Sequence, residues 1–427
     1  MAQRNLLGEP VVITGIGLVT ALGLDRETSW QAIRQGKSGI QLIHGVAGVP
    51  DESLCAGIVP LSDAPRGRLK AISLCERASD EALTNAGIDW QTIDRQRFGC
   101  SINGIMGDWH QIGVMSGLTP EDDERFPWWQ QWLPNSLCSV IAGRHQLQGP
   151  RLSHSTACAS SLISFLTAVR AIRDGQCDIA LAGGGDAIDP LFAAGFKQMR
   201  ALAESQDPQT ACRPFDRQRT GFVLGEGAAL FVIERLGHAL RRGARIYAEV
   251  SAGKMLAEAH HVTGLDAESE TLTHLIGITL DQAGLATSDI GYINAHGTGT
   301  QQNDLVEMRS IRRTFANDLQ HVCVSATKSM IGHAINGSGA IELAITALGM
   351  RDGFAPPTIN HTDPDPECVF DCLPLKGRVE RFQHALKLSV AFGGHLVAVV
   401  LSRWNDAQHG FSYPAWTYSE ARKQRVA

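Results

Sequence analysis

Short apolar runs alternate with amphipathic stretches along most of the chain. The first run, Val11 to Thr14, ends at Gly15, and a turn then leads to a helix predicted around Ser29 to Gln35. Further core strands are predicted at residues 97–103, 179–183, 228–234, 290–295, 322–325, 387–392 and 397–401. Helices are predicted between many of them, for example at 160–174 and 340–351. Strands that alternate with helices indicate an α/β layered fold.

Two of the predicted helices resemble each other in sequence. Residues 160–175 read SSLISFLTAVRAIRDG, and residues 338–353 read SGAIELAITALGMRDG. Both follow a strand end rich in Ser, Thr and Ala, and both close on Arg-Asp-Gly. We therefore expect two similar halves, residues 1–250 and 251–427.

Composition and net charge disfavour a nucleic-acid-binding protein, a membrane protein and a zinc protein. The 427 residues carry a net charge of −6, which gives no overall attraction to nucleic acid or to an anionic membrane. No run reaches the roughly 18 to 20 apolar residues that a membrane-spanning helix needs. Cys368 and Cys372 are the only close pair among ten scattered cysteines, and no paired C-x-x-C couples favour a zinc site. A soluble cytoplasmic protein with free thiols, without metal or cofactor, is expected.

Cys158 is a candidate nucleophile because it lies in HSTACASSLISF, where an extended stretch runs into a helix. Small neighbours allow close approach of a substrate. A cysteine in the first turn of a helix faces unpaired N–H groups, which is expected to lower its pKa. Taken alone, an inert buried cysteine explains the position as well.

Two further strand ends carry histidines. His296 lies in YINAHGTGTQQND, where two glycines let a ligand reach the backbone, and His333 lies in VSATKSMIGHAINGSGAIE with Lys328. Glu342, one helix later, could pair with that lysine. Each histidine could equally cap its strand. The pair Gly15 and Gly17 is no dinucleotide fingerprint, because Thr20 replaces its third glycine.

Five motifs together carry a resemblance. TACASS, GFVLGEGA, NAHGTGTxxND, ATKSMIGH and AFGG, in this order, resemble the elongating β-ketoacyl-(acyl carrier protein) synthases of the thiolase superfamily, from Val11 to about Trp404. The likeness is nearest to the type II fatty-acid and polyketide enzymes. It implies a thiolase-like, five-layered αβαβα fold from two pseudo-symmetric halves, in a homodimer or in a heterodimer with a related ketosynthase-like subunit.

The resemblance also implies roles for individual residues. Cys158 matches the acyl-accepting nucleophile, and His296 and His333 match the histidines that receive the malonyl thioester. Lys328 matches the lysine that supports the second histidine, with Glu342 beside it. The remaining positions are the gating Phe392, whose N–H joins that of Cys158 in an oxyanion hole, Thr298 and Thr300 along the phosphopantetheine channel, Ile105 in the acyl pocket, and Arg66, Arg68, Lys70 and Arg213 at the surface that meets the acyl carrier protein.

The implied reaction is a decarboxylative Claisen condensation. Cys158 takes an acyl chain from carrier protein, and neutral, N–H-donating histidines stabilise the enolate formed when malonyl-carrier protein loses carbon dioxide. Two features depart from the family. His395-Leu396 replaces the usual Thr-Asn after the last glycines, and residues 109–132 hold four of the eight tryptophans. Bulky aromatics beside an acyl channel favour rigid chains, which indicates a specialised polyene or polyketide synthase as an alternative to ordinary fatty-acid elongation.

Three other functions compete with this prediction. A non-catalytic chain-length partner lacks the nucleophile that Cys158 supplies here. A thiolase normally has a second cysteine near its last glycine motif, where this chain has Phe392 to His395. A nicotinamide oxidoreductase is disfavoured by the missing glycine fingerprint.

Overall fold

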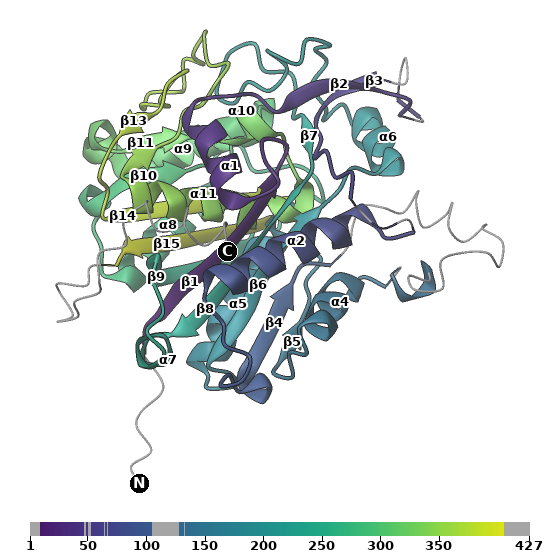
Figure 1. Ribbon diagram of the computed structural model, residues 1–427. Coiled ribbons are helices and arrows are strands. Elements are labelled where there is room, and N and C mark those ends of the chain that lie inside the picture. Colours follow the sequence, from purple (N-terminus) through teal and green to yellow (C-terminus); the bar gives the residue numbers. More distant parts are fainter. Residues whose placement is uncertain are drawn as a thin grey trace.

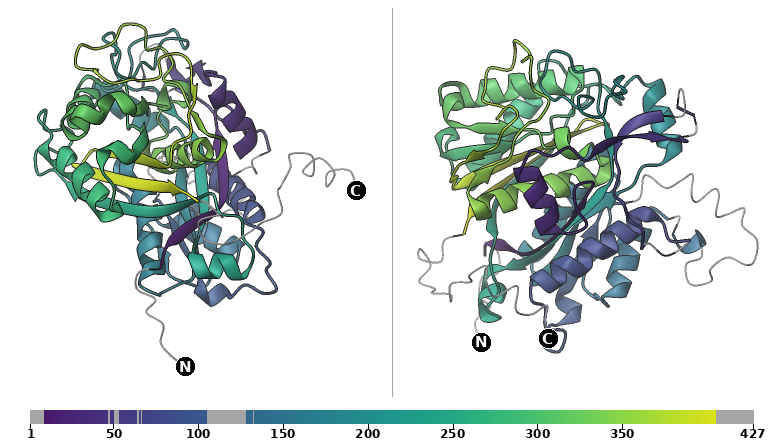
Figure 2. Two further views of the ribbon diagram at one scale, coloured as in Figure 1. Left: turned by 90° about the vertical axis from the view of Figure 1, so that its left-hand side faces the viewer. Right: turned by 45° about the horizontal axis from the view of Figure 1, so that its top comes forward.

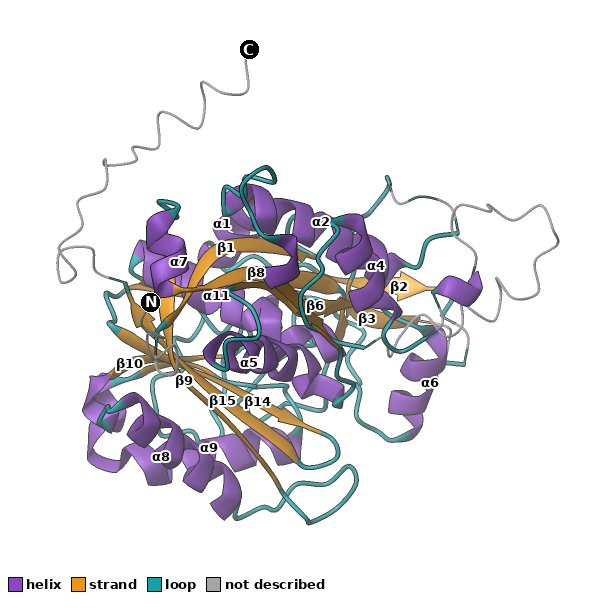
Figure 3. Cartoon of the chain, turned by 90° about the horizontal axis from the view of Figure 1, so that it is seen from below, coloured by secondary structure: helices purple, strands orange, loops and turns teal. Residues whose placement is uncertain are grey.

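The chain folds into five layers, two sheets alternating with three layers of helices (Figures 1 and 3). The computed structural model describes residues 9–46, 48–49, 53–63, 65, 67–104, 128–131 and 133–404. Figure 3 shows α2 and α4 outside the first sheet, α5 and α11 between the sheets, and α8 and α9 outside the second. This is the thiolase-like α/β architecture that the resemblance implied.

The strands of the first half are β1 (Val11–Thr20), β4 (Phe98–Ile102), β5 (Arg151–Leu152), β6 (Ile179–Asp186) and β8 (Gly227–Arg235). Those of the second half are β9 (Ala248–Ala257), β10 (Ile290–Asn294), β11 (Cys323–Ser325), β14 (His384–Ala391) and β15 (His395–Arg403). The main helices are α1 (Arg26–Arg34), α2 (Lys70–Asn85), α4 (Ser136–Arg144), α5 (Ser160–Arg173), α6 (Pro190–Gln198), α7 (Leu236–Arg241), α8 (Glu270–Ala283), α9 (Gln301–Phe315), α10 (Lys328–Ile331) and α11 (Ser338–Asp352). Short strands β2 (Ile40–His44), β3 (Ser53–Gly57), β7 (Leu224–Gly225), β12 (Phe354–Ala355) and β13 (Arg378–Val379) form two small sheets.

The two halves repeat one topology. The strand order is β5-β4-β6-β8-β1 in the first half and β11-β10-β14-β15-β9 in the second, with the same parallel and antiparallel pairings. The sheets join through two residue pairs of β1 and β9. Figure 2 shows the later residues, green to yellow, stacked mostly on one side of the earlier ones. The boundary near residue 250 stays a prediction, and that residue lies inside β9.

The central layer contains the repeat noticed in the sequence. α5 and α11 occupy equivalent places in the two halves and pack against each other. α11 is buried on all sides from Ser338 to Met350, which explains why its sequence is small and apolar around the whole circumference. The helix that begins after Cys158 and the helix that begins after His333 are therefore structural counterparts.

Several expected boundaries differ from the structure, and the end of the first strand differs most. β1 does not end at Gly15 but continues to Thr20. The two glycines of this strand let α2 lie directly on it, because a Cβ at Gly15 would come within 2.3 Å of Ala82 O and one at Gly17 within 1.9 Å of Ala78 O. In the described part of the chain, no helix has the length and apolar character to cross a bilayer.

Candidate active site

Cys158 lies in a strained turn between β5 and α5. The turn is the 3-10 segment η4 (Ala157–Ala159), and Ala157 has a φ of +47°, which L residues rarely adopt. The equivalent turn of the second half, η7 (Ile335–Gly337), begins with the same distortion at Ile335. The two turns contact each other, so the repeated topology brings the start of α5 against the start of α11.

The histidines converge on the Cys158 thiol. His333 Nε2 lies 3.1 Å from Cys158 Sγ, and the rings of His296 and His333 meet edge to face with centroids 5.3 Å apart. The Sγ and one nitrogen of each ring lie within 4.8 Å of one another. His296 follows β10 and His333 follows α10, so three chain segments supply the set. The structure thus brings together the three side chains that the sequence analysis singled out, and their catalytic roles stay a prediction.

Burial controls the charge of this set. It lowers the pKa of both His296 and His333 well below the ordinary value, and the Lys328 cation acts in the same direction. Both imidazoles are therefore neutral near pH 7, as the condensation chemistry requires. Burial also raises the pKa of Cys158 to about 12, with Lys328 opposing it. The expectation that the helix start lowers this pKa is wrong for the substrate-free site, where Cys158 is a thiol.

A buried charge cluster lies behind His296. Lys328 Nζ is 2.6 Å from Glu342 Oε1, and the other carboxylate oxygen of Glu342 is 2.7 Å from Lys387 Nζ. Lys328 also donates to His296 O at 2.6 Å and lies 3.2 Å from His296 Nδ1. The predicted partnership of Lys328 with the second histidine is thus replaced by contact with the first. Because an ammonium only donates, Nδ1 accepts, and Nε2 of His296 carries the hydrogen.

Ser338 fixes the other ring. Its hydroxyl lies 2.7 Å from His333 Nδ1 at the start of α11. A hydroxyl can accept or donate, so Ser338 supports either tautomer of His333. With Nδ1–H donating to Ser338, Nε2 is free to accept the Cys158 proton. With the hydroxyl donating, Nε2–H becomes a donor.

Two carboxylates under the loop of residues 296–300 were missed by the sequence reasoning. Glu307 accepts from the N–H groups of His296 and Gly297, both at 2.6 Å, and Asp304 Oδ1 accepts from Thr298 N at 3.0 Å. Both lie fully buried on the first turns of α9. The missed signal was their i, i+3 spacing directly after the glycine-rich motif. Lys387, inside an apolar strand, gave no pattern that distinguished it from a surface lysine.

A pocket of about 380 Å³ opens above the three residues. Cys158, His296 and His333 lie in its wall with Thr298, Thr300 and Phe392, as expected for the channel and gate. Phe392 packs against Phe196, whose ring also contacts Phe222. Gly393 and Gly394 follow the gate with φ values of +83° and +75°. Ile105 lies outside the described residues.

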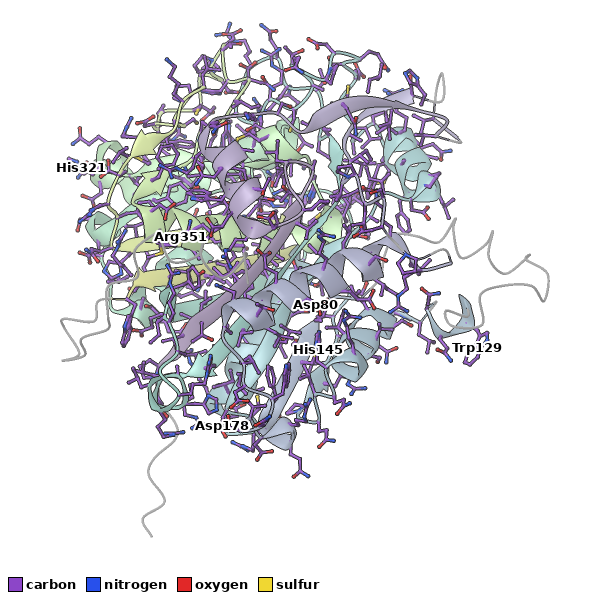
Figure 4. All side chains as sticks on the ribbon, in the orientation of Figure 1. Asp80, Trp129, His145, Asp178, His321 and Arg351 are labelled. Atoms are coloured by element: carbon purple, nitrogen blue, oxygen red, sulfur yellow. The ribbon has the colours of Figure 1, made fainter. Side chains whose placement is uncertain are left out.

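His395 and Leu396, which depart from the family pattern, lie at the start of β15. His395 begins β15 opposite Ala391, and Leu396 is buried in the core between β14 and β9. Trp109 and Trp132 lie outside the described residues. Trp129 is 56% exposed, and Figure 4 shows it at the periphery of the molecule.

The predicted basic surface is largely occupied by partners within the chain. Arg68 is mostly buried and forms an ion pair with Glu76, and Lys70 forms one with Glu226. Arg213 lies 3.2 Å from Asp216, and Arg66 lies outside the described residues. A different cation, the exposed Arg200, lies at the pocket wall, and within the described ranges it forms no ion pair.

Comparisons with known proteins agree with this geometry. The model of the β-ketoacyl synthase N-terminal domain matches residues 8–54 and 70–239, and that of the C-terminal domain matches 247–362. A tetracenomycin polyketide synthase ketoacyl synthase alpha subunit of Streptomyces glaucescens is 36% identical over 92% of this chain and 97% of its own. The 3-oxoacyl-[acyl-carrier-protein] synthase 2 of Coxiella burnetii is 36% identical over 93% of this chain and 99% of its own.

Solved structures give the same result. A type II polyketide synthase ketosynthase, in complex with its acyl-carrier protein and bound to the hexaketide, superposes with a TM-score of 0.86 at 30% identity, over 93% of this chain and 100% of that one. The ishigamide ketosynthase/chain length factor gives 0.83 at 30% identity, with the same coverage. The chain therefore belongs to the β-ketoacyl synthase family and is an acyltransferase-type condensing enzyme.

Proposed function

We propose that the chain is a 3-oxoacyl-(acyl carrier protein) synthase in which Cys158 accepts the acyl chain and His296 and His333 direct decarboxylation. The observation that carries the proposal is the meeting of one thiol and two neutral imidazoles in one buried pocket. Nothing in the proposed reaction calls for a metal or redox group. We place the reaction in the cytoplasm, where carrier-bound substrates are made.

Acyl transfer comes first. As Cys158 Sγ attacks the acyl thioester carbonyl, its proton passes to His333 Nε2, which lies 3.1 Å away. The carrier thiolate then leaves and takes up a proton. Because the resting thiol has a raised pKa, proton transfer accompanies attack rather than preceding it. We assign the oxyanion to the N–H groups of Cys158 and Phe392, since both residues line the pocket.

Decarboxylation and condensation follow. The malonyl thioester oxygen is held by the Nε2–H groups of His296 and His333, the second in the tautomer that Ser338 supports by donating to Nδ1. The bond to the carboxylate breaks, carbon dioxide leaves, and the electron pair moves into an enolate stabilised by these donors. The enolate carbon attacks the acyl-Cys158 carbonyl. Cys158 leaves as thiolate and takes up one proton from solvent, which balances the proton that left with the carrier thiol.

The competing function, a non-catalytic chain-length partner, is opposed by the complete thiol and imidazole set. The discriminating experiment incubates the protein with acyl-carrier protein and measures its intact mass. We expect an acyl adduct on the wild type and none on Cys158→Ala, a small change in volume that leaves the fold intact. An adduct that persists in the variant would reject Cys158 as the nucleophile.

The acyl carrier protein is proposed to dock at the pocket mouth. Arg200 supports this site, because it is exposed beside the pocket, whereas Arg68 and Lys70 are engaged with carboxylates. Arg200→Glu should raise KM for carrier-bound acyl groups and weaken the salt dependence of the reaction. Arg68→Gln serves as the comparison. An equal rise in KM in that variant would instead place carrier docking at the predicted surface of Arg68 and Lys70.

The acyl chain is the finer part of the proposal. Phe196, Phe222 and Phe392 line the pocket together with Cys158. A flat, conjugated chain that packs against such rings gains about 1 kcal/mol per aromatic contact. We propose a specialised polyene or polyketide synthase that works as a dimer, either with itself or with a related subunit. Competition between saturated and conjugated acyl-carrier proteins of equal length tests this. Preference for saturated chains by the protein alone would favour fatty-acid elongation.

A further inference from the structure

A second cluster of metal-ligand side chains lies apart from the active site. His361, Cys368 and Cys372 occupy the segment between β12 and β13, and one donor atom of each lies within 4.8 Å of the other two. The two sulfurs are 3.1 Å apart. The condensation chemistry uses none of the three.

The cluster is buried and incompletely satisfied. His361 is 5% exposed, and within the described residues its Nδ1 has no hydrogen-bond partner. A buried ring nitrogen without a partner costs about 1 to 3 kcal/mol, which indicates that something else satisfies it. Cys372 is fully enclosed, whereas Cys368 is partly exposed and offers a route of entry from solvent.

Two neighbouring cysteines suit a soft divalent cation. A bound ion would displace the thiol protons, and two thiolates would then cancel its charge within a poorly solvated site.

The spacing also fits. Thiolates of a tetrahedral zinc site, with Zn–S bonds of about 2.3 Å, lie about 3.8 Å apart. The two sulfurs would need to separate by about 0.7 Å, which side-chain rotation can supply. The C-x-x-x-C interval is within the range that zinc sites use, and His361 provides a third ligand. We propose that His361, Cys368 and Cys372 bind a thiophilic divalent metal of the Zn²⁺ type, with a fourth position open to water.

This departs from the expectation that the chain lacks a metal site, which rested on the absence of a C-x-x-C couple beside a second couple or beside paired histidines. A metal bound to this segment would stabilise the adjoining wall of the active-site pocket. The same segment carries Asp365, which pairs with Arg219 at 2.6 Å, and Arg219 in turn donates to Thr300 O in the active-site loop. A metal on this segment would hold that brace in place without touching the reacting atoms.

The test uses the full chain freed of metal by chelation under reducing conditions. Because the catalytic thiol and imidazoles could also take a metal, the background is Cys158→Ala. On adding Zn²⁺ we expect one metal per chain and a rise in the thermal midpoint. With Co²⁺ we expect the charge-transfer absorption of a thiolate ligand. Adding Cys372→Ala or Cys368→Ser should weaken binding by more than about 100-fold and remove the absorption.

A matched control exists in the first half. Cys100 and Cys138 form another buried thiol pair, 3.7 Å apart, and among the described residues this pair forms no such cluster with a histidine. Cys138→Ala should leave metal binding unchanged. Equal binding with and without the Cys372 change would overturn the proposal. So would a Cys368–Cys372 disulfide in protein that, once reduced, takes up no metal, since this would make the pair a redox element instead.

Discussion

The Lys328→Met variant tests whether Lys328 positions the His296 ring or only stabilises the folded state. Lys328 Nζ contacts His296 Nδ1 and thereby keeps the hydrogen on Nε2, toward the substrate. Methionine has a similar length and no donor, so the ring loses the contact that fixes its tautomer. The enolate then loses an assured N–H donor. Lys328 acts here as a positioning residue, through the imidazole.

The expected magnitude follows from these contacts. One oxyanion donor is worth about 3 to 4 kcal/mol, so decarboxylation of malonyl-carrier protein should fall by about 10²- to 10³-fold. Stability should fall by about 3 kcal/mol, the lower end for breaking a buried ion pair, because Glu342 keeps Lys387 as a partner. Acylation of Cys158 should fall by a smaller factor, since its proton goes to His333.

The assay compares two buried lysines of one cluster. Carbon dioxide release from malonyl-carrier protein and adduct formation on Cys158 are measured separately, each with the unfolding midpoint. Lys387→Met is the control, because this residue pairs with Glu342 and donates to Ala295 O and Leu388 O but, among the described residues, forms no hydrogen bond with an imidazole. We expect Lys387→Met to lose similar stability and to keep decarboxylation within about tenfold of the wild type.

The reasoning fails in either of two cases. Release of carbon dioxide at the wild-type rate by folded Lys328→Met would show that the tautomer needs no lysine. Alternatively, Lys387→Met could lose decarboxylation to the same extent. The effect would then belong to the charge of the cluster and not to the contact with the ring.

Three further outcomes are expected. Gly394→Ala should destabilise the protein and slow condensation far more than Gly393→Ala. A Cβ at Gly394 would lie 2.2 Å from Glu258 O, whereas one at Gly393 would meet only the His395 ring, at 3.1 Å. Equal unfolding midpoints of the two variants would contradict this. Glu307→Gln should cost about 2 kcal/mol, measured by denaturant unfolding, since its amide N–H₂ would face a backbone N–H that now donates to a carboxylate. Burial lowers the pKa of Lys387 to about 8, so the folded state binds fewer protons than the unfolded state above that value; stability should rise by about 3 kcal/mol from pH 8 to 10.5, and Lys387→Met should lack this rise.

The order of elements could be predicted well from sequence where local pattern decides it. Helix α5 was predicted at residues 160–174 and spans Ser160–Arg173, because its glycine end and apolar face are both local signals. β1 was cut short because Gly15 signals a turn as readily as close packing, and only α2, some 55 to 70 residues later, decides between them. Long-range packing of this kind leaves no trace in a local window.

In the candidate site, too, the residues with a local sequence signal could be predicted and those defined by long-range contacts could not. Cys158, His296 and His333 were singled out because small residues and glycines surround each of them, and the resemblance carried by five motifs implied their roles. Lys387 was missed because its partner Glu342 comes from another element and its own neighbours are ordinary strand residues. The docking role of the predicted basic surface stays a prediction. Sequence shows the charge of Arg68 but not the carboxylate of Glu76 that lies against it in the fold.

The strained turn at Cys158 and its counterpart after His333 lie far apart in the sequence, so the ribosome completes the active site in two stages. Cys158 and His333 are separated by 175 residues. At about 5 to 20 residues per second, a ribosome exposes the cysteine roughly 10 to 35 seconds before the histidine emerges. Through that interval the thiol has no proton acceptor and no enclosing second half. The newborn chain therefore carries Cys158 as an ordinary exposed thiol, and acyl transfer begins only when the second half has folded against the first.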